Sequence, residues 1–207
     1  MIIITGAAGF IASCLAHNLL RGDPEIHLLL VDKFTFEEKN KNLPTDDRCT
    51  RISRAKLFDY LEEKEPSIDC IYHLGARTDT AEQNIDLFQK LNIEYSKNIW
   101  SYCALNEIPL VYASSAATYG DGSLGFDDNH EIVSQLKPLN PYGDSKQIFD
   151  KWVLEQFLEP PSWYGVKFFN VFGPNEFHKG RMASVIFHAY KQIEKTGKMK
   201  LFRSHRD

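Results

Sequence analysis

A tyrosine and a lysine four residues apart, Tyr142 and Lys146, are the pair of this sequence best suited to acid–base chemistry. Pro141 stands just before them, and proline is favoured at the first position of a helix, so we expect a helix here. Side chains four positions apart share one helix face. A phenol loses its proton only near about pH 10, but a neighbouring ammonium lowers that pKa. Tyr142 would then be able to take the proton of an alcohol near neutral pH.

The Tyr142–Lys146 pair is weak evidence alone, because both residue types are common on solvated helix faces. Ser115 adds a hydroxyl at the end of residues 108–115, an apolar segment typical of a buried strand. A lone strand-end serine would be unremarkable. Beside Tyr142, however, it would orient a substrate alcohol, while Lys146 would hold a nicotinamide ribose. The three side chains together predict a hydride-transfer site.

A glycine turn near the N-terminus predicts the cofactor site. Residues 2–4 form a short apolar run typical of a buried strand, and residues 11–20 carry helical spacing. Between them, Gly6 would allow a tight turn and Gly9 would let backbone N–H groups approach a pyrophosphate at the helix N-terminus. Ala12 stands where a third small residue permits close packing of helix on strand. A simple loop turn is the alternative.

The second expected strand, residues 27–32, ends in an acid. Asp32 lies where an acid can bond the adenosine ribose hydroxyls, which favours NAD. Lys33 and Lys39 follow closely and would suit the 2′-phosphate of NADP, unless they lie with Lys41 on a solvated loop. These residues leave both NADP and NAD open as the cofactor.

The remaining segments alternate between strand and helix patterns. We expect further strands at 68–74 and from 166, and helices at 57–65, 82–105, 141–158 and 182–196. Residues 35–54 and 120–138 look like long polar loops. This alternation predicts an α/β fold with a doubly wound parallel sheet, the Rossmann arrangement. Ligands bind at the carboxyl ends of strands in such sheets, which brings the glycine turn and Ser115 to one crevice.

Composition excludes several classes of protein. The 207 residues are 43% hydrophobic and 25% charged, ordinary values for a soluble globular domain. A net charge of -4 gives no reason to expect nucleic acid or an anionic membrane as a partner. No apolar run of about 18 residues and no signal peptide is visible. The cysteines lack metal-type spacing. We expect a cytoplasmic protein with reduced thiols and no metal site.

The motifs resemble a known family. Thr5-Gly6-x-x-Gly9-x-x-Ala12, residues 114–120 and Tyr142-x-x-x-Lys146 are similar to motifs of the extended short-chain dehydrogenases/reductases. The family's third glycine is an alanine here, a small change that should not block nucleotide binding. Residues 112–120 and 169–185 resemble one branch, the nucleotide-sugar epimerases that act at C6 of ADP-heptose. The run His178-Lys179-Gly180 is the most discriminating part.

The resemblance implies a reaction. ADP-D-glycero-D-manno-heptose and ADP-L-glycero-D-manno-heptose, precursors of lipopolysaccharide core heptose, would interconvert through transient oxidation by bound NADP+. Tyr142 would take the C6 hydroxyl proton, and Lys179 would be the second acid–base group. A solvated loop charge is the alternative for Lys179. The resemblance also implies a homo-oligomer, with a pentamer suggested.

Site residues carried over from the resemblance fall into three groups. The catalytic residues would be Ser115, Tyr142, Lys146 and Lys179. The cofactor would meet Gly6, Gly9, Phe10, Ile11, Asp32, Lys33, Lys39, Leu74, Gly75, Ala76, Arg77, Thr78, Asn92, Tyr142, Lys146, Val171 and Lys179. The substrate would meet Ser115, Asn170, Arg181, His188, Phe202, Arg203, Ser204 and His205.

For two of these residues, the residue type or the sequence pattern is informative without the resemblance. Arg181 suits a diphosphate, because its planar fork binds phosphate bidentately. His188 lies on the apolar face of the last expected helix and, without the resemblance, would be read as a packed core histidine. The resemblance further implies that residues 1–173 form the NADP-binding domain and residues 174–207 begin a smaller substrate domain. It implies roughly a hundred additional residues to complete that domain.

Other functions are compatible with parts of the pattern. A nucleotide-sugar 4-epimerase or 4,6-dehydratase would share the fold. A dehydratase would be expected to carry acidic residues after the catalytic serine, whereas Ala116 and Ala117 follow Ser115 here. A non-catalytic NADP-sensing Rossmann protein is a third alternative. Such proteins typically lose the tyrosine or the lysine, and both are present.

Overall fold

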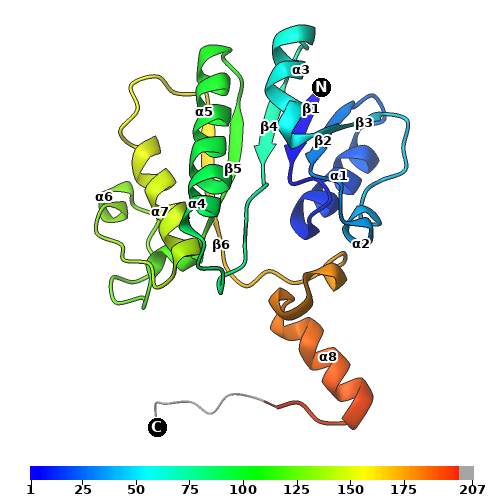
Figure 1. Ribbon diagram of the computed structural model, residues 1–207, viewed down its shortest axis with the longest axis vertical. Coiled ribbons are helices and arrows are strands. Elements are labelled where there is room, and N and C mark those ends of the chain that lie inside the picture. The colour runs from blue at the N-terminus through cyan, green and yellow to red at the C-terminus, as the bar shows by residue number, and fades with distance from the viewer. Residues whose placement is uncertain (201–207) are drawn as a thin grey trace.

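The computed structural model describes residues 1–200 of the chain (Figure 1). Its centre is a 6-stranded sheet in the order β3-β2-β1-β4-β5-β6, and every neighbouring pair of strands is parallel. This is the strand order of dinucleotide-binding domains, so the predicted doubly wound α/β class is confirmed. The strands are β1 (Ile2–Thr5), β2 (Leu28–Asp32), β3 (Cys49–Ser53), β4 (Cys70–His73), β5 (Leu110–Ser115) and β6 (Trp163–Phe168).

Helices connect successive strands, and shorter turns lie between them. The helices are α1 (Phe10–Gly22), α2 (Glu37–Asn40), α3 (Leu57–Lys64), α4 (Ile85–Phe88), α5 (Tyr95–Leu105), α6 (His130–Val133), α7 (Pro141–Val153) and α8 (Val185–Thr196). A π-helical turn, Gln89–Glu94, joins α4 to α5. Short 3₁₀ segments occupy Arg54–Lys56, Ala116–Tyr119 and Phe177–Met182, and the last of these is interrupted by non-helical backbone at Gly180.

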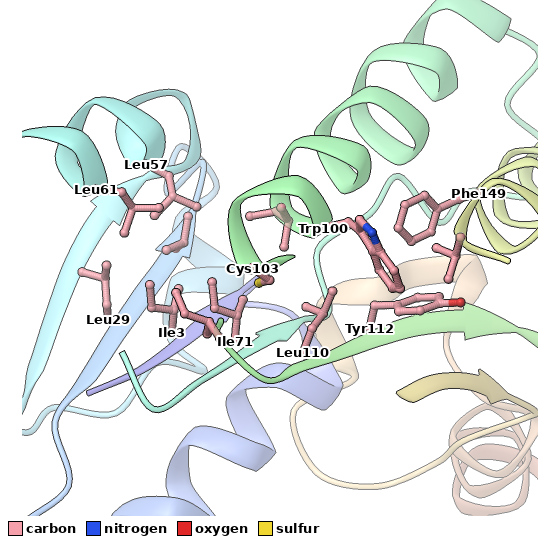
Figure 2. Packing of buried hydrophobic residues seen from close by; sticks show 14 residues of the cluster. Ile3, Leu29, Leu57, Leu61, Ile71, Trp100, Cys103, Leu110, Tyr112 and Phe149 are labelled. Carbon is pink, nitrogen blue, oxygen red and sulfur yellow. The ribbon is translucent and has the colours of Figure 1, made fainter. Parts of the chain in front are cut away.

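Alternate residues of the strands face two apolar layers. Ile3, Leu29 and Ile71 point to one face of the sheet, where side chains of α3, α5 and α7 cover them (Figure 2). Ile4 and Leu30 point to the other face, where α1 packs. Both faces of the central strands are thereby buried, which explains why these strands read as continuous apolar runs. Figure 2 also shows Leu57, Leu61, Trp100, Cys103, Leu110, Tyr112 and Phe149 in the first layer.

The expected loop over residues 35–54 was wrong, because this stretch contains α2 and β3. β3 lies at the edge of the sheet and pairs with β2. Its central residues Thr50 and Arg51 are exposed, so the strand has no apolar run that a sequence pattern would reveal. The 120–138 loop likewise contains the short α6.

Several predicted boundaries also shift. The helix of Tyr142 ends at Val153 rather than near Leu158. The last helix begins at Val185 rather than Met182, because the Ser184 side chain accepts a hydrogen bond from the Phe187 N–H and caps it. The predicted start at Pro141 is confirmed, and the Asn140 side chain caps this helix by accepting from the Gly143 N–H at 2.8 Å.

The C-terminal part of the described chain stands apart from the sheet. Figure 1 shows α8 projecting away from the rest of the molecule, and none of its residues is buried. His188 is half-buried, so it is not the packed core histidine that the apolar pattern alone suggested. Within residues 1–200, no helix is long and apolar enough to cross a membrane. Across those same residues, no group of potential ligands is arranged to hold a metal ion.

Candidate active site

The glycine turn between β1 and α1 brings two backbone segments into contact. Gly6 has a φ of +68°, and a Cβ added to it would lie 2.6 Å from the Gly75 Cα. Glycine is therefore required there both by the conformation and by the close approach. Gly9 precedes the first residue of α1 and forms no side-chain cap. The N–H groups at the start of this helix are therefore available to an anion.

Adjoining cavities run from this turn along the carboxyl ends of the strands. One of about 380 Å³ lies at the glycine turn, and another of about 380 Å³ lies beside Asp32. A smaller one of about 60 Å³ connects them. A fourth, of about 370 Å³, continues from the glycine turn to Ser115 and Tyr142. The elongated crevice that they form fits a dinucleotide, with one end at Asp32 and the other at Tyr142.

Nearly all the predicted cofactor residues line this crevice. Asn92 is the exception, because it is fully buried and borders none of these cavities. Instead, it holds the backbone of Arg77, which does border the crevice. Its side chain accepts from the Arg77 N–H at 2.8 Å and donates to the Arg77 carbonyl at 2.9 Å and to the Ser145 hydroxyl at 2.9 Å. The π-helical turn places it there, and such turns often occur at functional sites.

The Asp32 end of the crevice is rich in cations. The Asp32 carboxylate accepts from the N–H groups of Ala8 and Lys33 at 3.1 and 2.7 Å. It also accepts from the Lys39 ammonium. Arg54 borders both cavities at this end and was missed by the sequence reading. Recognising β3 in the sequence would have revealed Arg54. Ser53, the last residue of β3, pairs with Asp32 in the sheet, and Arg54 follows it directly.

At the other end, Ser115, Tyr142 and Lys146 line one cavity, as the sequence predicts. The Lys146 ammonium donates to the Ala113 carbonyl at 2.8 Å. Burial lowers the pKa of Lys146 to about 8. Burial also raises the pKa of Tyr142, and hydrogen bonding with Ser115 acts in the opposite direction. The expected lowering of the Tyr142 pKa by Lys146 was therefore wrong for this structure, because desolvation dominates and the ammonium is directed at a carbonyl.

A buried ion pair fixes α7 to the sheet behind this cavity. The Asp150 carboxylate accepts from the Lys167 ammonium at 2.5 Å and from the Ser114 hydroxyl at 2.6 Å. Lys167 also donates to the Thr118 hydroxyl at 2.9 Å. These bonds connect α7, β5 and β6 next to Ser115 in the chain and one helical turn after Lys146.

Lys179 lies where two of the cavities meet. It borders both the cavity at the glycine turn and the cavity of Tyr142. Its ammonium lies 5.5 Å from the centroid of the Phe10 ring. Lys179 is half-buried at this position, which favours the predicted role over the alternative of a solvated loop charge.

Only some of the predicted substrate residues lie at the cavity of Tyr142. Asn170 and Arg181 line the same cavity as Tyr142. Arg181 forms an ion pair with Asp79 at 2.7 Å. His188 lines none of the crevice cavities. Phe202, Arg203, Ser204 and His205 lie outside the described residues.

A larger cavity, of about 890 Å³, lies beside β6 at the sheet edge. Tyr119, Phe126 and Trp163 contribute to its walls. It does not border the glycine turn, Tyr142 or Lys146, so its size is no reason to move the candidate site there.

Curated relatives of this chain share one name. It is 42% identical over 212 residues to the ADP-L-glycero-D-manno-heptose-6-epimerase of Fusobacterium nucleatum, an alignment covering 100% of this chain and 63% of the relative. It is 42% identical over 207 residues to the enzyme of the same name from Nitratidesulfovibrio vulgaris, covering 99% of this chain and 63% of the relative. The chain thus spans less than two thirds of the length of these relatives.

Solved structures share the fold. The ADP-L-glycero-D-manno-heptose-6-epimerase of Helicobacter pylori matches with a TM-score of 0.84 and 28% identity, covering 98% of this chain and 65% of that one. The UDP-glucuronic acid 4-epimerase of Bacillus cereus, solved with NAD, matches with a TM-score of 0.72, and the alignment covers 94% of this chain and 63% of that one; at 22% identity this likeness concerns the fold alone. Residues 2–207 match the model of the NAD dependent epimerase/dehydratase family. The chain therefore belongs to the NAD dependent epimerase/dehydratase family.

Proposed function

We propose that this protein is a 6-epimerase that interconverts ADP-D-glycero-D-manno-heptose and ADP-L-glycero-D-manno-heptose, as in the supply of heptose for lipopolysaccharide. The observation that carries the proposal is the gathering of Ser115, Tyr142, Lys146 and Lys179 around one cavity continuous with the glycine-turn crevice. The curated relatives, which bear the name of this activity at 42% identity, support the choice of substrate.

The side chains have separate tasks in this reaction. When bound, a nicotinamide cofactor supplies the acceptor that takes a hydride from C6 and returns it. Ser115 orients the C6 hydroxyl, and its hydrogen bond with Tyr142, which lowers the pKa of the phenol, favours the form of Tyr142 that removes the hydroxyl proton as the alcohol becomes a ketone. Lys146 holds the ribose next to Tyr142. Lys179, on the separate 177–182 segment, gives a proton to the C6 oxygen when the ketone is reduced on its other face, so that the alcohol is formed again.

We further propose that the cofactor is NADP rather than NAD. Lys33, Lys39 and Arg54 border the cavity at the Asp32 end, where Asp32 is the one acid among the lining residues that the structure describes. Lys39 already compensates the charge of that acid. A 2′-phosphate entering this cavity meets a surplus of positive charge, and arginine and lysine both bind phosphate well.

The division into residues 1–173 as cofactor domain and 174–207 as the beginning of a substrate domain is supported by the exposure of α8. We also propose that the protein is cytoplasmic and homo-oligomeric. Apolar side chains exposed on α8, among them Ile186 and Tyr190, are compatible with further contacts. The pentamer is supported by the family resemblance alone.

The decisive experiment uses protein expressed from the complete open reading frame. Incubation with ADP-D-glycero-D-manno-heptose, without added cofactor, should give a mixture of the two C6 epimers by NMR. This result would also indicate that the cofactor is retained and recycled. A Tyr142→Phe variant should give no detectable mixture over the same time. Absence of conversion by the wild type, even with NADP+ or NAD+ supplied, would reject the 6-epimerase proposal.

A further inference from the structure

The buried side chain of Asn42 lies between the glycine turn and the segment that carries Lys179. Asn42 follows α2 and is 2% exposed. Its amide nitrogen lies 3.1 Å from each of the Ala8 carbonyl, the Asn175 carbonyl and His178 Nδ1. The last two partners are 133 and 136 residues away in sequence. One side chain thus joins the cofactor turn to a distant loop.

The loop on the far side of this contact is closed on itself. The Glu176 carboxylate accepts from the Gly173 N–H at 3.2 Å and from the Ser184 N–H at 2.6 Å, which holds the two ends together. The Lys179 N–H donates to the Glu176 carbonyl at 2.9 Å. These hydrogen bonds hold the loop to itself, so its contacts with the rest of the domain bear on where Lys179 lies.

A second contact supports the same placement. The Asn175 side chain donates to the Ser13 hydroxyl of α1 at 3.1 Å. Asn175 has a φ of +70°, a left-handed conformation that asparagine tolerates better than most residues. This backbone bend turns its carbonyl toward Asn42. The amide of Asn42 therefore meets the loop at two of its residues.

The charged groups around His178 favour a neutral imidazole, which can accept a hydrogen bond from Asn42. Burial lowers the pKa of His178, and the neighbouring ammonium groups of Lys39 and Lys179 lower it further. The Asn175 carbonyl and Asp32 act in the opposite direction. A neutral imidazole has one nitrogen that can accept a hydrogen bond, and the two N–H groups of the Asn42 amide are shared among this nitrogen and the two carbonyls.

We propose that Asn42 is a positioning residue that acts through Lys179, with His178 as its partner on the loop. This inference rests on the proposed function, in which Lys179 gives a proton to the C6 oxygen. Asn42 borders none of the crevice cavities, so it does not contact the ligand itself. Its removal leaves buried carbonyls unpaired and frees the loop. A displacement of about 1 Å at a reacting group can cost about 100-fold in rate.

The test of catalysis is a double-mutant cycle in the holoenzyme. Asn42→Leu, which keeps the volume and removes the donor, should lower kcat by about 10- to 100-fold and change cofactor affinity by less than about threefold. In a Lys179→Met background the same change should cost less than about threefold. Asn106→Leu, at an exposed amide near the end of α5, is the matched control and should leave kcat unchanged. Equal losses in both backgrounds would overturn the proposal.

His178 variants keep the test valid if Asn42→Leu does not fold. His178→Phe retains the ring and loses the nitrogen, so kcat should fall as for Asn42→Leu. His178→Asn returns a polar atom to about the place of Nδ1 and should restore much of the loss. A His178→Asn variant as slow as His178→Phe would count against a hydrogen-bonding role.

Hydrogen exchange provides a measurement that does not depend on turnover. In the unliganded protein, Asn42→Leu and His178→Phe should speed exchange of the Lys179 and Ala183 amides at least about 10-fold, with the α7 amides unchanged. Unchanged exchange in the loop would overturn the positioning role. If the wild type makes no epimer, the proposed function fails, and exchange alone then decides whether Asn42 holds the loop.

Discussion

The Lys39 ammonium contacts both oxygens of the Asp32 carboxylate, at 3.1 and 2.8 Å. The acid that would bond ribose hydroxyls and a cation that would bind a 2′-phosphate are therefore already paired. The pair is largely shielded, with side-chain exposures of 27% and 10%. Its presence means that cofactor preference depends on the balance of charges at this end of the crevice, not on Asp32 alone.

Replacing Lys39 by alanine should weaken NADP+ binding by about 10- to 100-fold and NAD+ binding much less, because a charged hydrogen bond to the 2′-phosphate is lost. Isothermal titration with each dinucleotide measures the two affinities. Lys41→Ala is the matched control, since Lys41 is exposed and paired with Glu38. Equal weakening of both cofactors would indicate that Lys39 serves the pyrophosphate instead.

Replacing Tyr142 by phenylalanine should lower kcat by about 100- to 10,000-fold while cofactor affinity changes little, because only the proton-transferring hydroxyl is removed. The measurement is epimer formation under saturating substrate, together with dinucleotide titration. Tyr164→Phe, at an exposed position of β6, should be fully active. A Tyr142→Phe enzyme with near-normal kcat would exclude Tyr142 as the base.

The neutral imidazole of His73 should make stability fall in acid. His73 is buried between the Thr5 and Ser96 hydroxyls, at 2.7 and 2.9 Å. Burial lowers its pKa from 6.5 to about 3. Between these values the unfolded chain binds a proton that the folded chain does not, so the free energy of unfolding decreases as pH falls from about 6.5 to about 3. The slope for one proton is up to about 1.4 kcal/mol per pH unit.

Urea unfolding at a series of pH values tests this. The wild type should lose its stability advantage over His73→Gln across that window, because the variant lacks the titrating group. His27→Gln, at an exposed histidine, serves as the control. Parallel pH curves for the wild type and His73→Gln would contradict the prediction.

Breaking the buried Asp150–Lys167 pair should destabilise the protein strongly. Both side chains are largely buried, with exposures of 15% for Lys167 and 6% for Asp150. Asp150→Asn or Lys167→Met alone should lower the free energy of unfolding by about 3–5 kcal/mol, since each leaves a buried charge without its partner. The double variant should recover much of the loss in denaturant unfolding, and purely additive losses would show that the two groups are not coupled.

Local patterns in the sequence determined much of this protein. The short apolar runs predicted β1, β2, β4 and β5, because strands buried on both faces need continuous apolar residues. The glycine turn, the helix start at Pro141 and the gathering of Ser115, Tyr142 and Lys146 were also predictable. Each depends on residue spacing or on the general rule that parallel strands end at one edge of the sheet.

Other features depended on contacts between distant residues. β3 was missed because an edge strand keeps exposed polar residues, and Arg54, which follows it, was missed with it. The interior position of Asn92 depends on a π-helical turn that spacing does not reveal. The pKa of Tyr142 depends on burial, which the assembled fold imposes and which outweighs the hydrogen bond with Ser115.

The proposed role of Asn42 depends entirely on tertiary structure. Nothing near it in sequence distinguishes it from the other polar residues of the 35–54 stretch. Its role arises only when the fold brings the glycine turn and the Lys179 loop to either side of it. Sequence determined which residues could do the chemistry, because residue type and local spacing are encoded along the chain. Tertiary structure decided how they are held, because burial and long-range hydrogen bonds exist only once the chain has folded.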